Sequence, residues 1–143
     1  MPRGTILLVE DDKGYREACK EYLEIRDYIV IACENSWEAL ETIDGGLVFD
    51  LALVDLHLPE PEWDGYRSFG PSVKAGYDLV KEIKKRDQKK PIIVMSGYDE
   101  PPSKLRQFCL EYPSGREGIT FFSKEDSINL IKLIDQIYQP PKE

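Results

Sequence analysis

Cysteine and histidine, which build disulfides and most zinc sites, are scarce in this sequence. The 143 residues include three cysteines and one histidine. Cys19, Cys33 and Cys109 are odd in number, lie far apart and show no C-x-x-C spacing. This pattern argues against a disulfide framework or a zinc site and predicts reduced thiols in a cytoplasmic protein. We expect all three to be small core residues.

Long apolar runs are also missing. No stretch approaches the roughly 18 consecutive apolar residues of a membrane-spanning helix, and the N-terminus lacks the basic and then apolar segments of a signal peptide. We therefore expect no membrane insertion. Positive charge is in deficit, because 19 Lys and Arg face 27 Asp and Glu, a formal net charge of -8. Such a surface repels phosphates, which disfavours direct nucleic-acid binding and suits a bound cation or a basic partner.

The chain does contain five apolar segments, each followed by a stretch with helical periodicity. The expected strands are 5–10, 28–33, 50–56, 91–96 and 119–123, and the expected helices are 13–25, 36–43, 76–86, 103–112 and 126–138. Strands that are apolar throughout are typical of a parallel sheet buried on both faces. The alternation predicts an α/β fold, a doubly wound five-stranded parallel sheet in a three-layer sandwich.

Several finer expectations accompany this assignment. We expect one domain over residues 1–143, with its core at about 4–138 and a tail at 139–143. Residues 59–76, rich in proline and glycine, are expected to form an extended irregular loop. Ser36 is expected to cap the second helix. The last helix is expected to bury one stripe, made of Ile128, Ile131, Ile134 and Ile137.

Polar residues follow four of the five strands. They are Glu10, Asp11 and Asp12 after the first strand, Asp55 after the third, Ser96 after the fourth and Lys124 after the fifth. Carboxyl ends of parallel strands share one edge of the sheet, where ligands bind. Asp55 is the most unusual, because it interrupts the apolar run LALVDLHLP, and a buried carboxylate is costly unless it is paired or binds a metal.

Carboxylates gathered at one edge need a cation. Two of them 4 Å apart repel by roughly 1 kcal/mol in water and about 4 kcal/mol at an effective dielectric of 20. The all-oxygen donor set indicates Mg²⁺, or Mn²⁺, rather than zinc. Lys124 and the Ser96 hydroxyl are then suited to a phosphoryl group. Asp55 is the natural nucleophile, which would form an aspartyl phosphate.

Four motifs in this order resemble those of the receiver domains of two-component response regulators. They are LLVEDD at 7–12, LALVDLHLP at 51–59, PIIVMSG at 91–97 and FFSK at 121–124. The match spans essentially the whole chain, apart from the extended 59–76 connection. The resemblance implies a flavodoxin-like (βα)5 sandwich with strand order 2-1-3-4-5, as in chemotaxis-type single-domain receivers.

The resemblance also implies roles for individual residues. Asp55 would accept a phosphoryl group from the phosphohistidine of a sensor histidine kinase or a phosphotransfer protein. Asp11 and Asp55 would bind Mg²⁺ directly, Glu10 would act through water, and the backbone carbonyl of His57 would complete the protein ligands. The protein would be no enzyme beyond Mg-dependent self-phosphorylation and slow autodephosphorylation.

The same resemblance implies a switch. Lys124 and Ser96 would contact the phosphoryl group, and Phe121 would turn inward as the coupled aromatic side chain. The domain would then bind an unknown downstream protein target through its fourth helix, fifth strand and fifth helix. A homodimer through that face is a further expectation. Such a switch rests on new charge-assisted hydrogen bonds to the phosphoryl oxygens.

Some features depart from the family pattern, and alternatives remain open. Glu125 stands where the family usually has proline, often in cis, after the lysine. For Asp12 we favour the role of a helix N-cap, and for the His57 side chain an exposed position in a loop. The alternatives are a phosphorylation-independent pseudo-receiver or scaffold, and a regulatory domain excised from a larger response regulator. A remote one is an aspartate-nucleophile phosphohydrolase, which His57 disfavours because that family has a second acid at this position.

Overall fold

The chain alternates strands and helices along its whole length. The computed structural model describes residues 2–59, 73–97, 103–112 and 117–138. The strands are β1 Gly4–Val9, β2 Tyr28–Cys33, β3 Leu51–Asp55, β4 Ile92–Ser96 and β5 Ile119–Ser123. The helices are α1 Lys13–Ile25, α2 Ser36–Asp44, α3 Val73–Arg86, α4 Ser103–Cys109, the 3₁₀ helix η1 Lys124–Asn129 and α5 Leu130–Ile137. The five expected strands are confirmed to within one residue at each end.

The five strands form one parallel sheet in the order β2-β1-β3-β4-β5. This is the predicted order, and the sheet is doubly wound. Because successive strands run outward from β1 in one direction and then from β3 in the other, the order reverses between β1 and β3. Ligands of such sheets bind beside this reversal, at the carboxyl ends of the strands. The end of β3 is Asp55.

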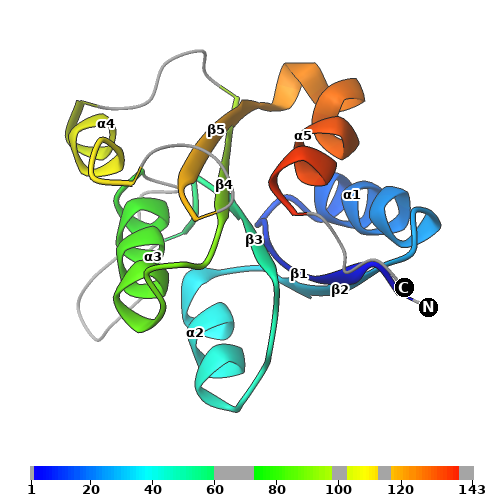
Figure 1. Cartoon of the computed structure of the whole chain (residues 1–143), viewed down its shortest axis with the longest axis horizontal. Helices are drawn as coiled ribbons and strands as arrows, with labels where there is room; N and C mark the ends of the chain where they lie inside the picture. The colour runs from blue at the N-terminus through cyan, green and yellow to red at the C-terminus, as the bar shows by residue number, and fades with distance from the viewer. Residues whose placement is uncertain (1, 60–72, 98–102, 113–116, 139–143) are drawn as a thin grey trace.

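Helices cover both faces of the sheet and make it the middle of three layers (Figure 1). Helices α1 and α5 lie on one face, and α2 and α3 lie on the other. Alternate residues of β3 enter the two cores: Leu51 and Leu53 face α1 and α5, while Ala52 and Val54 face α2 and α3. All five residues of this strand are buried, the four apolar residues as predicted and Asp55 with them.

Gly76 brings α3 against the chain that leaves β3. A Cβ atom at this position would collide with the backbone of Leu56, including its carbonyl oxygen. Only glycine permits such a close approach between a helix and a neighbouring backbone. The approach fixes the path of residues 56–57, which follow Asp55 directly.

The third helix begins earlier than the sequence pattern predicts. It starts at Val73 rather than at Gly76, so the expected loop 59–76 is shorter by at least one helical turn. Its aromatic residues, Trp63, Tyr66 and Phe69, lie outside the described residues, as do the segment 98–102 and the tail 139–143. The second helix begins where expected, but its cap is Asn35 and not Ser36: the Asn35 side chain accepts a hydrogen bond from the Glu38 backbone N–H at 2.8 Å.

The expectation of a last helix over 126–138 with a four-residue buried stripe is wrong at its start. Ile131, Ile134 and Ile137 are buried in α5, but Ile128 is 88% exposed. The chain passes first through η1, where Asp126 has the non-helical angles φ -104 and ψ 38, and α5 begins only at Leu130. The 3.6-residue period of α5 therefore cannot be extended backwards to Ile128.

The cysteines behave as the sequence predicts. All three are unpaired, with Cys19 and Cys33 buried and Cys109 half-buried. Burial raises the pKa of the Cys19 thiol to about 11, so this sulfur is protonated and unreactive at neutral pH. Among the described residues, no helix combines the length and the apolar character needed to cross a membrane.

Candidate functional site

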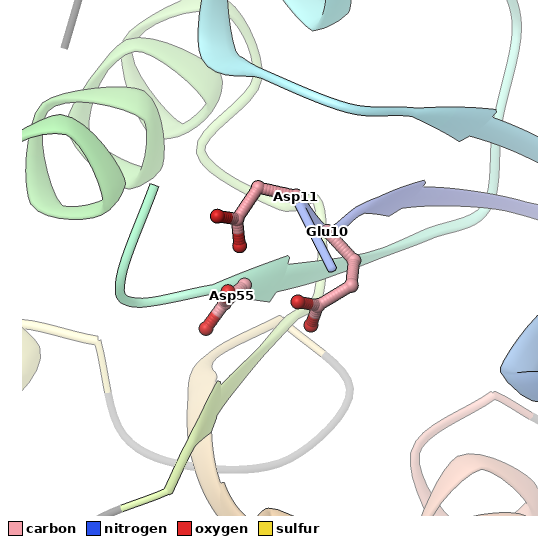
Figure 2. A group of neighbouring side chains, drawn as sticks. All are labelled: Glu10, Asp11 and Asp55. Atoms are coloured by element: carbon pink, nitrogen blue, oxygen red, sulfur yellow. The ribbon is translucent and has the colours of Figure 1, made fainter. Parts of the chain in front are cut away.

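Three carboxylates converge at the carboxyl edge of the sheet (Figure 2). Glu10 and Asp11 follow β1 directly, and Asp55 ends the neighbouring strand β3. One oxygen atom of each side chain lies within 4.8 Å of the others. Glu10 and Asp55 are buried, with 0% and 2% exposure, whereas Asp11 is half-buried. The order reversal between β1 and β3 is what brings these acids together.

Lys124 closes the cluster from β5, as the sequence predicts. Its Nζ lies 2.8 Å from Glu10 Oε2 and 3.4 Å from Asp55 Oδ1, so it bridges two buried carboxylates. Burial alone would lower the pKa of Lys124, but the Glu10 and Asp55 carboxylates outweigh it and raise that pKa above its usual value. The ammonium is therefore charged at neutral pH and balances part of the negative charge.

Asp55 is held in a state that resists ionisation. Burial and then the negative charge of Glu10 raise the pKa of Asp55 to about 8, although Lys124 and the His57 backbone N–H act in the opposite direction. That N–H donates to Asp55 Oδ1 at 3.2 Å. One lysine is thus insufficient to neutralise the pocket, and additional positive charge would favour the ionised form of Asp55.

The loop between β1 and α1 is fixed by two residues. Asp12 caps α1, because its Oδ1 accepts a hydrogen bond from the Tyr15 backbone N–H at 3.0 Å. This confirms the N-cap interpretation. Arg16 Nη1 donates to the carbonyl oxygens of Glu10 at 2.8 Å and Asp11 at 3.2 Å. These bonds hold the backbone that carries the two acids, and they leave the carboxylates aimed at the pocket.

The other expected site residues have more varied surroundings. Ser96 ends β4, is 5% exposed and lies opposite Ser123 in the sheet register. Phe121 of β5 is half-buried and packs against the core on the α2 and α3 face. The His57 side chain is half-buried and not exposed as expected, and burial and the Lys124 ammonium lower the pKa of its imidazole, while Asp11 acts in the opposite direction.

Sequence reasoning missed two residues of this site, Arg16 and Tyr15. Arg16 lies one turn into α1, where a long basic side chain is usually solvated. The Tyr15 ring centroid lies 4.7 Å from Lys124 Nζ. The sequence placed Tyr15 on an apolar helical face, but the tertiary contact with a residue from β5 has no local signal.

The cluster fits a hard divalent cation. Carboxylate oxygens are the preferred ligands of Mg²⁺, which binds through few protein groups and keeps open positions for phosphate oxygens. Glu10, Asp11 and Asp55 supply such oxygens, and a cation would offset the burial and the Glu10 charge that raise the pKa of Asp55. No cysteine belongs to the cluster among the described residues, which agrees with a hard cation rather than zinc.

Comparison with protein families identifies the class. The family model of the response regulator receiver domain matches residues 6–112, and the chain belongs to this family. Receiver domains are in general phosphoacceptor signalling domains of two-component systems and not enzymes. As a class they bind Mg²⁺ at an acidic pocket and interact with histidine kinases and downstream effectors.

The curated relatives are longer proteins. The chain is 30% identical over 129 residues to a cyclic di-GMP phosphodiesterase of Thermotoga maritima, covering 90% of this chain and 29% of that protein. It is 26% identical over 147 residues to the DNA-binding transcriptional regulator NtrC of a Bradyrhizobium species, covering 100% of this chain and 26% of that protein. The chain thus spans about a quarter to a third of the length of these relatives.

Solved receiver domains match the fold over nearly the whole chain. The CheY-like receiver domain of Methanospirillum hungatei JF-1 is 26% identical with a TM-score of 0.66, covering 92% of this chain and 94% of that one. The non-phosphorylated HemR receiver domain of Leptospira biflexa is 28% identical with a TM-score of 0.66, covering 100% of both chains. The flavodoxin-like expectation is confirmed.

Proposed function

We propose that this chain is a phosphoryl-controlled switch in which Asp55 accepts a phosphoryl group from a phosphohistidine. The observation that carries the proposal is the position of Lys124 Nζ, 3.4 Å from Asp55 Oδ1, beside a pocket with two further carboxylates. The family supports it, because receiver domains are phosphoacceptors. The donor would be a sensor histidine kinase or a phosphotransfer protein.

The residues divide the reaction between them. Glu10, Asp11 and Asp55, with the backbone carbonyl of His57, would hold Mg²⁺, which supplies positive charge for the phosphoryl oxygens when bound. An oxygen of ionised Asp55 forms the new O–P bond. The P–N bond of the donor breaks, and its electron pair stays with the imidazole nitrogen, which takes up a proton. Lys124 stabilises the charge on the transferred group.

Phosphorylation of Asp55 would change the positions of side chains in and after the neighbouring strands β4 and β5. Ser96 and Lys124 would hydrogen-bond the phosphoryl oxygens, and Phe121 would turn inward with Ser96. To move a two-state equilibrium from 1:99 to 99:1 takes about 5.5 kcal/mol of differential stabilisation. Charge-assisted hydrogen bonds from two donors and a metal can supply energies of this order. The face formed by α4, β5 and α5 would then bind the downstream protein or a second copy.

The scope of the function is also part of the proposal. We infer that residues 1–143 act as a single receiver domain in the cytoplasm, either alone or as the regulatory domain of a larger response regulator. The two curated relatives carry the matching region within longer chains, as in the second arrangement. A pseudo-receiver that binds partners without phosphorylation is the alternative that the experiment below separates.

The test uses a small phosphodonor and a matched pair of variants. The protein is incubated with acetyl phosphate and Mg²⁺, and intact mass spectrometry is expected to show one added phosphoryl group. Asp55→Asn is expected to abolish it. Asp50→Asn is the control, because Asp50 immediately precedes the same strand and accepts a hydrogen bond from the Thr5 backbone N–H at 2.8 Å, at the opposite edge. A label that persists in Asp55→Asn contradicts the site, and an unlabelled wild type favours the pseudo-receiver.

A further inference from the structure

The ammonium of Lys124 has an aromatic neighbour as well as its two carboxylates. The ring centroid of Tyr15, from the first turn of α1, lies 4.7 Å from Lys124 Nζ. This separation is within the range of a cation–π contact, in which the negative face of the ring attracts a cation. Tyr15 is half-buried, so its ring also shields the ammonium from part of the solvent.

The two carboxylates hold the Lys124 ammonium unequally, and the shorter contact is not the one with Asp55. Nζ lies closer to Glu10, at 2.8 Å, than to Asp55, at 3.4 Å. Lys124 is also the first residue of η1, a 3₁₀ segment that contains a kink, and a lysine side chain loses much rotamer entropy when it is fixed. The Tyr15 ring adds an aromatic contact that helps to restrict the ammonium and offers no carboxylate acceptor for its N–H groups.

We propose that Tyr15 is a positioning residue, whose ring holds the Lys124 ammonium beside Asp55 while its N–H groups remain available to the phosphoryl oxygens. This inference rests on the proposed function for its kinetic consequence. Tyr15 acts through Lys124 and does not itself contact the phosphoryl group. Aromaticity, and not the phenolic hydroxyl, is the property that matters.

A second tyrosine on the same helix supplies a matched control. Tyr15 and Tyr22 both line an apolar cavity of about 350 Å³ between α1 and the start of α5, together with Ala18, Cys19, Ile128 and Leu130. The Tyr22 ring instead contacts the Arg26 guanidinium, 5.8 Å from the ring centroid. Replacing Tyr22 also changes the lining of this cavity, but it leaves the ring beside Lys124 in place.

The direct test is spectroscopic and needs no phosphorylation. A lysine held over an aromatic ring has its ε-CH₂ protons shifted upfield by the ring current, and Lys124→Arg assigns the signal. Tyr15→Leu is expected to abolish the upfield shift, whereas Tyr15→Phe and Tyr22→Leu retain it. A Lys124 signal unchanged in Tyr15→Leu overturns the proposal. Should Tyr15→Leu fail to fold, Tyr15→Met serves as the second replacement without a ring.

The kinetic test measures the rate of labelling by acetyl phosphate at saturating Mg²⁺. Tyr15→Leu is expected to lower the rate roughly three- to tenfold, the size of a partly desolvated cation–π contact. Tyr15→Phe is expected to restore it and Tyr22→Leu to leave it near the wild-type value. An equal fall in Tyr15→Phe, or in Tyr22→Leu, overturns the positioning role. If the wild type is not labelled at all, the proposed function fails, and the proton shift alone decides whether Tyr15 positions Lys124.

Discussion

Two lysine side chains pack at opposite edges of this sheet. One contacts carboxylates, and the other contacts backbone carbonyl groups. Lys124 follows β5 and lies between the carboxylates of Glu10 and Asp55. Lys84, in the last turn of α3, is 1% exposed. Its Nζ donates to three backbone carbonyl oxygens, those of Gln88 at 3.0 Å, Lys90 at 2.7 Å and Glu117 at 2.8 Å.

The pKa values of the two lysines shift in opposite directions. Burial lowers the pKa of Lys84, since its hydrogen-bond acceptors carry only partial charges. The pKa of Lys124 is raised, because its contacts with the Glu10 and Asp55 carboxyl groups outweigh its burial. Carbonyl dipoles therefore suit a fixed structural contact, and Lys84 ties the loop before β4 to the start of β5. Carboxylates create a charge balance that a metal or a phosphoryl group can change.

The largest effect is expected when the structural lysine is removed. Lys84→Met buries no charge but removes the donor of three backbone carbonyl groups, and we expect a loss of about 3 kcal/mol in the free energy of unfolding. Urea denaturation measures it. Labelling of Asp55 is expected to persist under native conditions, because Lys84 lies at the other edge of the sheet. A loss below about 1 kcal/mol would mean that water replaces the ammonium, and the contrast between the two lysines would fail.

The same two lysines show how far sequence reasoning reaches. Lys124 was predicted, because parallel strands end at one edge and four of the five strands are followed by polar residues. The acids of the site were anticipated in the same way, whereas the strand order was expected from the resemblance to receiver domains. Lys84 gave no signal: it stands among Lys85 and Arg86, where a basic run at a helix end normally faces water. Its burial depends on Glu117, which is 33 residues away along the chain.

The start of α5 exposes a second limit. The helical period through Ile131, Ile134 and Ile137 was read correctly, but Ile128 was assigned to the same stripe. Periodicity is a local signal, and it does not report where a chain leaving a strand first becomes α-helical. The kink at Asp126 in η1 decides this, and it belongs to the connection that carries Lys124.

The second prediction concerns Asp55 and the pH dependence of the free energy of unfolding. Because the pKa of Asp55 is raised from 3.8 to about 8, the folded state binds this proton more tightly than the unfolded state. Ionisation therefore costs stability as the pH rises from about 4 towards 8. Without divalent metal, Asp55→Asn is expected to be more stable than the wild type at pH 8, with the difference vanishing near pH 4. Thermal unfolding in EDTA at several pH values measures it.

A control for this pH dependence is Asp50→Asn, at the other end of β3. Asp50 accepts a hydrogen bond from the Thr5 backbone N–H, so its replacement is expected to destabilise the protein and not to reproduce the pH-dependent gain of Asp55→Asn. A stability of Asp55→Asn that follows the wild type at all pH values would contradict the strained state of Asp55.

A smaller effect is expected for Lys124→Met, and it should depend on metal. The variant leaves Glu10 and Asp55 without their cation, which is expected to lower the free energy of unfolding at neutral pH in EDTA. Because Mg²⁺ would neutralise the same carboxylates, it is expected to raise the melting temperature of Lys124→Met more than that of the wild type. Lys84→Met should show no such excess. If Mg²⁺ raised the melting temperature of all three proteins equally, Lys124 and Mg²⁺ would not neutralise the same carboxylates.

The smallest effect is expected for Lys81→Met. It tests whether the contribution of Lys124 to stability depends on burial rather than on its types of partner. Lys81 lies on the solvent side of α3, one turn before Lys84, with a side chain 43% exposed. It has both kinds of partner seen at Lys124: a carboxylate, with Asp78 Oδ1 at 3.5 Å, and an aromatic ring, with the Tyr77 centroid at 4.3 Å. Water screens these contacts, so Lys81→Met is expected to change the free energy of unfolding by less than about 0.5 kcal/mol in urea denaturation, with or without Mg²⁺. A loss comparable to that of Lys124→Met would show that the ion-pair and ring contacts act equally at the surface, and that enclosure by the sheet edge adds nothing to them.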